Sequence, residues 1–393
     1  MLAENIIAVG AQDWDRRLFD QLIPLPEGTS YNAYLVRGSQ KTALIDTVDP
    51  TKTGILVDHL MRAGAERIDY VVSNHAEQDH SGSLPDVLML YPDAKVLTNP
   101  KCKKMLMDLL ELEEERFVEV SDGQEISLGD KTLKFIYTPW VHWPETMCTY
   151  LKEDKILFSC DFFGSHQACS ELFVQDESKV YEAAKRYYAE IMMPFRSAIA
   201  GNLKKLEALE IAMIAPSHGP VYQRPGLIVD AYKDWISERV SNTAIVAYVS
   251  MHDSTRKMVE YLVDALTGRG LRVKQFNLVG ADIGQLAVEL VDAATVVLGS
   301  PTVLAGAHPA AMYCAALVNA LRPKTRFVGI IGSYGWGGKM VEQLAGLLAG
   351  LKAETLEPVL AKGQPGPEDF EKLEQLAQAV FEHHKKAGIT EEN

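Results

Sequence analysis

Six consecutive residues, 75–80, carry four side chains that can bind a metal ion. The segment reads His-Ala-Glu-Gln-Asp-His and lies between an apolar run and a turn of small residues, which predicts a buried strand ending in a loop of ligands, with a helix just after. Alternate side chains of an extended segment share a face, so His75, Glu77 and Asp79 should point one way, and a bend at Asp79 and His80 would divide the ligands between two ions. Two imidazoles and two carboxylates at this density favour a metal site over an ordinary polar loop.

Lone ligands recur further along the same half of the chain. His142, Asp161 and His218 each follow a predicted strand. A lone histidine at a strand end is commonly a structural residue, but this recurrence favours one shared site. With the segment 75–80 the set holds four His, two Asp and one Glu, too many for one tetrahedral ion but suited to two ions with a bridging carboxylate. Asp161 is the candidate bridge, and His166 is a competing ligand.

Composition narrows the class of protein. A length of 393 residues predicts two domains, and a hydrophobic content of 47% predicts that each has an ordinary globular core. The formal net charge of −14 argues against nucleic acid or an anionic membrane surface as the main partner. No signal peptide is visible, and no apolar run reaches the roughly 18 residues that span a bilayer. The five cysteines are scattered and never form C-x-x-C, so we expect no disulfide framework and a reducing cytoplasm.

The second half begins after a polar joint. The predicted domains are 1–240 and 243–393. The apolar strand 244–249 runs into a hydroxyl-rich loop and a helix, an arrangement that binds phosphate. Neither an NTP P-loop motif nor G-x-G-x-x-G occurs there. The loop resembles the flavodoxin phosphate loop, and two later strand ends carry Gly-rich and aromatic loops, so we expect FMN. The predicted FMN contacts are Ser250, Met251, His252, Asp253, Ser254, Thr255, Pro301, Thr302, Val303, Leu304, Ser333, Tyr334, Gly335, Trp336 and Gly337.

The metal motif, H-x-E-x-D-H followed by His, Asp and His, resembles that of the metallo-β-lactamase superfamily. Glu77 stands where that superfamily usually has His, and this substitution resembles the flavodiiron proteins (A-type flavoproteins). The resemblance implies an α/β chain in which a metallo-β-lactamase-like αββα sandwich precedes a flavodoxin-like doubly wound parallel sheet. It also implies two non-haem irons, one bound by His75, Glu77, His142 and Asp161, the other by Asp79, His80, Asp161 and His218.

The same resemblance predicts an activity. FMN would pass electrons to the di-iron site, which would reduce O2 to water or NO to N2O. It implies a separate rubredoxin-like donor and a head-to-tail homodimer or dimer of dimers. Asp20 stands where many members carry His, so the proton donor and the preferred gas stay open, with Tyr188 as a candidate donor. The tail 383–386 is interpreted as a solvated end.

Two other readings compete with this one. The first is a zinc hydrolase of the metallo-β-lactamase superfamily fused to a flavodoxin-like domain, against which Glu77 counts, since a further hard anionic ligand suits iron. The second is an electron carrier whose metal domain is degenerate.

Overall fold

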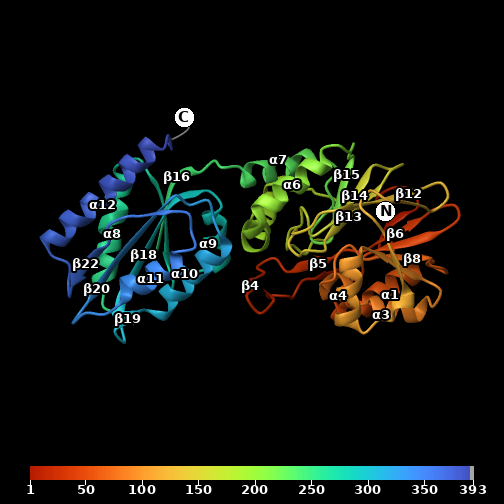
Figure 1. The fold of residues 1–393 in the computed structure, drawn as a ribbon, viewed down its shortest axis with the longest axis horizontal. Helices are drawn as coiled ribbons and strands as arrows, with labels where there is room; N and C mark the ends of the chain where they lie inside the picture. The colour runs from red at the N-terminus through yellow and green to blue at the C-terminus, as the bar shows by residue number, and fades with distance from the viewer. Residues whose placement is uncertain (390–393) are drawn as a thin grey trace. The chain divides into compact units, whose positions relative to one another are not determined.

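The computed structural model of the protein describes residues 1–389 and separates into two compact units (Figure 1). The first unit comprises Met1–Tyr188 and Phe195–Ile236, and the second comprises Ala189–Pro194 and the chain from Ser237 onwards. The sequence places the division between residues 240 and 243, and the short segment Ala189–Pro194 has no counterpart in that prediction. No helix within residues 1–389 is both long and apolar enough to cross a bilayer.

The first unit is built on two sheets that lie face to face. The six-stranded sheet has the order β1 (Ile6–Ala8), β6 (Tyr34–Arg37), β7 (Thr42–Ile45), β8 (Tyr70–Val72), β9 (Lys95–Thr98), β10 (Phe117–Glu119). The five-stranded sheet has the order β11 (Glu125–Ser127), β12 (Thr132–Tyr137), β13 (Met147–Leu151), β14 (Ile156–Cys160), β15 (Met213–Pro216). Two small ribbons pair β2 (Ala11–Asp13) with β5 (Thr29–Tyr31), and β3 (Leu18–Phe19) with β4 (Ile23–Pro24).

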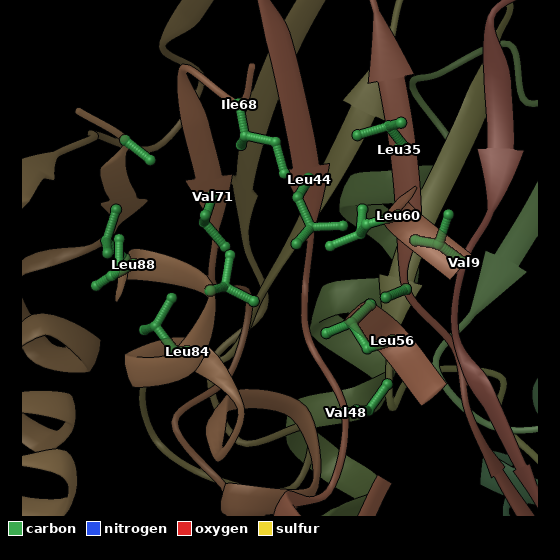
Figure 2. Packing of buried hydrophobic residues seen from close by; sticks show 14 of the residues in the cluster. Val9, Leu35, Leu44, Val48, Leu56, Leu60, Ile68, Val71, Leu84 and Leu88 are labelled. Atoms are coloured by element: carbon green, nitrogen blue, oxygen red, sulfur yellow. The ribbon is translucent and has the colours of Figure 1, made fainter. Parts of the chain in front are cut away.

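Strand alternation sends neighbouring side chains of the first sheet into different cores. Leu44 packs on the outer side, against Leu56 and Leu60 of α1, while its neighbour Ile45 packs between the two sheets with residues such as Phe158. Figure 2 shows the outer core, in which α1 and α3 cover the sheet. The helices of this unit are α1 (Thr53–Arg62), α2 (Gln78–Ser81), α3 (Leu84–Leu90), α4 (Pro100–Leu110), α5 (Glu177–Tyr187), α6 (Arg196–Leu206) and α7 (Gly226–Ile236). The predicted αββα sandwich is confirmed.

The second unit is a doubly wound sheet. Its strands follow the order β17 (Arg272–Asn277), β16 (Ser241–Tyr248), β18 (Ala293–Val303), β20 (Phe327–Tyr334), with β21 (Glu354–Thr355) and β22 (Val359–Lys362) beside β20, and β19 (Gly306–Ala307) forming a hairpin with β18. Its helices are α8 (Ser254–Thr267), α9 (Ile283–Leu290), α10 (Pro309–Leu321), α11 (Met340–Leu348) and α12 (Pro367–Lys386). The main strands pair in parallel, so the chain crosses over between β16 and β18. The predicted flavodoxin-like fold is confirmed, and such a sheet binds ligands beyond its carboxyl edge at the crossover.

The end of α12 differs from the prediction. The sequence indicates a solvated tail at 383–386, but the side chain of His384 is buried, with 1% of its surface exposed. Its Nε2 lies 2.7 Å from Thr295 Oγ1 and its Nδ1 lies 2.8 Å from Asn242 Oδ1. Val380 and His384 are four residues apart and thus share the buried face of α12, so the helix continues to pack where its composition becomes polar.

Candidate metal centre

The segment 75–80 leaves the end of β8 and turns one residue earlier than predicted. His75 and Glu77 lie in the loop, and α2 begins at Gln78, so Asp79 and His80 are on a helical turn and not in an extended strand. Gly82 ends this turn, and a Cβ there would overlap the Gln78 carbonyl oxygen and the Pro50 ring. The tight turn therefore brings Asp79 back toward the ligands that precede it.

The remaining predicted ligands leave the second sheet. His142 lies in the loop between β12 and β13, Asp161 follows β14, and His218 follows β15. Strands β14 and β15 are adjacent and parallel, so Asp161 and His218 emerge at the same edge, tied by the Ser217 N–H, which donates to the Cys160 carbonyl over 2.9 Å. The site thus joins the ends of strands from two different sheets.

The first set of ligands comprises His75, Glu77, His142 and Asp161, whose ligand atoms lie within 4.8 Å of one another. Glu77 Oε2 is 3.1 Å from the Nε2 atoms of both His75 and His142. Asp161 Oδ2 is 3.4 Å from His75 Nε2 and 3.3 Å from His142 Nε2. Four donor atoms therefore converge on one small volume.

The second set comprises Asp79, His80 and His218. The Nε2 atom of His80 is 3.3 Å from Asp79 Oδ1, and that of His218 is 3.2 Å from Asp79 Oδ2. The other oxygen of Asp161, Oδ1, lies 3.0 Å from His80 Nε2 and 3.3 Å from His218 Nε2. The structure brings all seven predicted ligands together, and Asp161 directs one oxygen to each set, as a bridge would.

Several of these ligand atoms have no hydrogen-bond partner among the neighbouring side chains that the structure describes, which is the situation expected of atoms that bind a metal ion. Within residues 1–389, both oxygens of Asp79, both ring nitrogens of His80 and Oδ2 of Asp161 are buried without a hydrogen-bond partner. Buried polar atoms without partners are rare and costly, whereas lone pairs pointing at a common centre are what a cation requires.

The electrostatics also call for added positive charge. Burial alone would raise the pKa of Asp161, but His80, His142 and His218 hold it well below its ordinary value. Burial lowers the pKa of His142, but the neighbouring carboxylates of Asp161 and Glu77 raise it to about 9. In the metal-free protein protons on the imidazoles balance the carboxylates, and metal ions would displace them.

Other residues near the cluster separate into different roles. His166 is not within either ligand set; its Nδ1 lies 2.9 Å from Thr29 Oγ1. Cys160 lies beside His80 and Asp161, and burial raises the pKa of its thiol well above the ordinary value.

The two neighbouring tyrosines of α5 and the following turn point to different partners. Tyr187 donates to Asp161 Oδ1 over 2.8 Å, whereas Tyr188, the predicted proton donor, donates to the Trp235 carbonyl over 3.3 Å. The structure brings Tyr187 to the cluster and not Tyr188. Sequence reasoning also gave no role to Glu145, whose Oε1 is 2.7 Å from His75 Nδ1. The one sequence feature that could have pointed to Glu145 is its position near His142 in a rigid loop that contains proline and tryptophan.

The predicted FMN contacts lie at the carboxyl edge of the second sheet. The N-cap of α8, Asp253, has a left-handed backbone and makes no side-chain capping bond, while the Arg256 N–H of the first turn donates to Ser250 Oγ over 3.2 Å. The Asp253 carboxylate is exposed and lies 3.1 Å from the Arg256 guanidinium. Thr255 Oγ1 lies 3.0 Å from Ser333 Oγ and so joins the first loop to the third.

Space and exposed apolar surface accompany these loops. A Cβ added at Gly335 would have no atom within 4 Å, and the side chains of Trp336 and Leu304 are 87% and 96% exposed. Pro301, Thr302 and Val303 belong to β18, whose end turns at Leu304 into the hairpin with β19. Open backbone, a hydroxyl-rich loop at a helix N-terminus and exposed apolar side chains fit a phosphorylated planar ligand such as FMN.

Comparisons with known proteins agree with this division. Residues 29–219 match the family described as ODP family beta lactamase, and residues 246–376 match the flavodoxin family. The chain is 36% identical to a nitric oxide reductase of Moorella thermoacetica, over 93% of this chain and 92% of that protein. It is 34% identical to a type A flavoprotein of Rhodobacter capsulatus, over 97% and 91%, and 34% identical to a coenzyme F420H(2) oxidase of Methanothermobacter marburgensis, over 88% and 89%.

Solved structures show the same two-unit arrangement along the chain. A rubredoxin oxygen:oxidoreductase from Desulfovibrio gigas aligns with a TM-score of 0.94 and 30% identity, covering 98% of each chain. A flavodiiron protein from Giardia intestinalis aligns with a TM-score of 0.90 and 28% identity, covering 97% of each chain. The fold and site thus define a metallo-β-lactamase-like metal protein with a flavodoxin domain. The chain belongs to the flavodiiron, or type A flavoprotein, family.

Proposed function

We propose that this chain is an oxidoreductase in which FMN passes electrons to two non-haem irons that reduce O2 to water, NO to N2O, or both. The observation that carries this proposal is the pair of ligand sets that share Asp161. Relatives named for nitric oxide reduction and for oxygen reduction support both gases as substrates.

The residues present suit iron. His75, Glu77, His142 and Asp161 would hold one ion, and Asp79, His80, Asp161 and His218 the other. Bound iron would supply electrons and Lewis acidity to the gas. Glu77 provides the harder, anionic ligand that favours iron over the zinc of related hydrolases.

Protons have two candidate carriers near the site. The Tyr187 hydroxyl already donates to Asp161 Oδ1, so it holds a hydrogen at the bridging carboxylate. Partial burial, followed by repulsion from Glu77 and Asp79, raises the pKa of Asp20, an exposed residue, above its ordinary value, so its carboxyl retains a proton at higher pH than a free aspartate does. Tyr188 stays an untested candidate.

The electron donor belongs to the same proposal. A rubredoxin-like protein is the donor we propose, by analogy with the relative named rubredoxin-oxygen oxidoreductase. Two relatives are named for rubredoxin and for coenzyme F420H(2), so we propose coenzyme F420H(2) as the alternative donor. We further propose a cytoplasmic head-to-tail homodimer, or dimer of dimers, in which FMN of one chain faces the metal site of the other. The five cysteines are scattered along the sequence and never form C-x-x-C, which favours a reducing compartment.

The decisive experiment is anaerobic turnover of iron- and FMN-loaded protein. Reduced rubredoxin or F420H(2) is supplied, consumption of O2 and of NO is followed separately, and iron and zinc are quantified. We expect two irons and one FMN per chain, with gas consumption abolished in His218→Ala and retained in the control His383→Ala, which alters a histidine outside the site. Stoichiometric zinc with ester or lactam hydrolysis and no gas consumption would establish the hydrolase instead, and unchanged gas reduction in His218→Ala would exclude this site.

A further inference from the structure

The two ligand sets are chemically matched. Each offers two histidines and one carboxylate of its own, with one oxygen of the shared Asp161. Ligand type therefore gives neither ion a stronger hold on the ferric state. Any difference between the ions must come from groups that touch the ligands from outside.

One such group is charged and serves only one set. Nδ1 of His75 lies 2.7 Å from Oε1 of Glu145, and both side chains are fully buried, with 0% of their surface exposed. In the second set, Nδ1 of His218 lies 2.6 Å from the Ser30 carbonyl oxygen, which is neutral, and Nδ1 of His80 has no hydrogen-bond partner within residues 1–389. The two sets therefore differ in that a histidine of the first set, His75, contacts the carboxylate of Glu145 through its Nδ1 atom.

The position of the proton follows from this contact. Two acceptors 2.7 Å apart need a hydrogen between them, and the Ala76 N–H is shared between Glu145 Oε1, at 3.1 Å, and His75 Nδ1, at 3.0 Å. The arrangement is satisfied when His75 carries its hydrogen on Nδ1 and donates it to the carboxylate. Nε2 of His75 then keeps its lone pair directed toward Glu77 and Asp161, as a metal ligand requires.

The carboxylate is held in place from its backbone. Asn99 caps α4, with its Oδ1 accepting from the N–H groups of Lys101 and Cys102. The Nδ2 of the same side chain donates to the Glu145 carbonyl over 2.5 Å. The backbone of Glu145 is therefore tied to the start of α4, although Glu145 belongs to the loop between β12 and β13 that carries His142.

We propose that Glu145 is a positioning residue that sets the order in which the two irons are reduced. Its buried negative charge, and the hydrogen bond that makes His75 a stronger donor, both favour a ferric ion over a ferrous one. One electron from reduced FMN would convert the diferric pair to a mixed-valence pair, and a second electron would give the diferrous pair. The ion of the His75 set would stay ferric until the second electron arrives. This inference rests on the proposed function, since it takes the ions to be iron.

The test is a potentiometric titration of the iron-loaded protein, followed by electron paramagnetic resonance of the mixed-valence pair. Glu145→Gln keeps the size and the acceptor oxygen but removes the charge. We expect the lower-potential step to rise, so that the two steps approach each other and the maximal mixed-valence signal falls. A tenfold change in the ferric-to-ferrous binding ratio corresponds to about 59 mV for one electron.

A matched control alters an uncharged contact on the other set. Thr29 Oγ1 lies 3.5 Å from Nδ1 of His218, and Thr29→Val removes that hydroxyl while keeping the volume. We expect the separation of the two steps to be unchanged in this variant. Thermal melting and iron content verify that both variants fold and bind metal.

Other outcomes would overturn the assignment. An unchanged separation in Glu145→Gln, or an equal shift of both steps, means that the charge does not distinguish the ions. If Glu145→Gln releases iron, selective loss of one ion per chain supports the assignment to the His75 set, and equal loss of both contradicts it. Wild-type protein that binds no iron or consumes no gas would refute the proposed function, whereas normal turnover with an unaltered separation would refute only the role of Glu145.

Discussion

Tyr187 donates its hydroxyl hydrogen to Oδ1 of Asp161 over 2.8 Å. This oxygen also faces His80 and His218, so the phenol touches the bridging carboxylate on the side of the second ligand set. The contact links the aromatic interior of the first unit directly to the metal centre.

Removing that hydroxyl should disturb the centre. In Tyr187→Phe we expect roughly tenfold weaker iron retention and slower gas reduction, because a hydrogen bond to a charged group contributes about 1.5–3 kcal/mol. Iron retention against a chelator and the rate of gas consumption measure this. Tyr188→Phe is the control, because that hydroxyl donates to the Trp235 carbonyl, and a larger effect in Tyr188→Phe would reverse the assignment.

Asp20 is expected to assist protonation without holding metal. Asp20→Asn should lower gas reduction by about tenfold or more, the range in which a positioned acid contributes, while iron and FMN content stay the same. Steady-state turnover and metal analysis provide the measurement. Asp15→Asn changes a neighbouring exposed carboxylate and should have no effect, and equal activity of the two variants would remove Asp20 from the mechanism.

The buried imidazole at the end of α12 should make the second unit sensitive to acid. Burial, with a smaller effect from His383, lowers the pKa of His384 to about 4. The unfolded chain therefore binds more protons than the folded one between about pH 6.5 and 4, so stability present above pH 6.5 is lost as the pH falls through this window.

Urea unfolding of the full chain from pH 7 to pH 4, followed by flavin release, measures this loss. His384→Gln should be less stable at pH 7, by on the order of 1 kcal/mol, but should show a flatter profile, because glutamine does not titrate. An equally steep profile in this variant would assign the acid sensitivity to other groups.

Metal ions should stabilise the first unit in particular. They neutralise buried carboxylates and bind only the folded arrangement, so chelation should lower the melting temperature of that unit. Differential scanning calorimetry before and after chelation, with iron restored as the control, reports the change. The melting transition of the flavodoxin-like unit should not move, and a shared shift would mean that the two units unfold together.

The sequence predicted most of the site because its ligands are local or sit at strand ends. The segment 75–80 contains four candidate ligands by itself, and Asp161 was proposed as the bridge because it lies between the other candidate ligands in sequence. The turn at Gln78 was placed one residue late, since it depends on Gly82 fitting closely against Pro50, a contact remote in sequence.

Contacts across the fold were beyond sequence reasoning. Glu145 reaches His75 from another sheet, and only the folded arrangement shows which of its neighbours it meets. The contact of Tyr187 with Asp161 was not predicted, because helical spacing does not say which of two adjacent side chains faces a site. The burial of His384 was not predicted, because the polar sequence around it does not show that its ring contacts Thr295 and Asn242 in the folded chain.

Strand β8 supplies its ligands from one sheet, and β14 and β15 supply theirs from the other. Bound ions would consequently link the two sheets of the sandwich at this edge, as a crosslink does. Deleting a ligand then changes architecture as well as chemistry, so a less active variant with an intact metal centre is better sought at Asp20 than among the seven ligands.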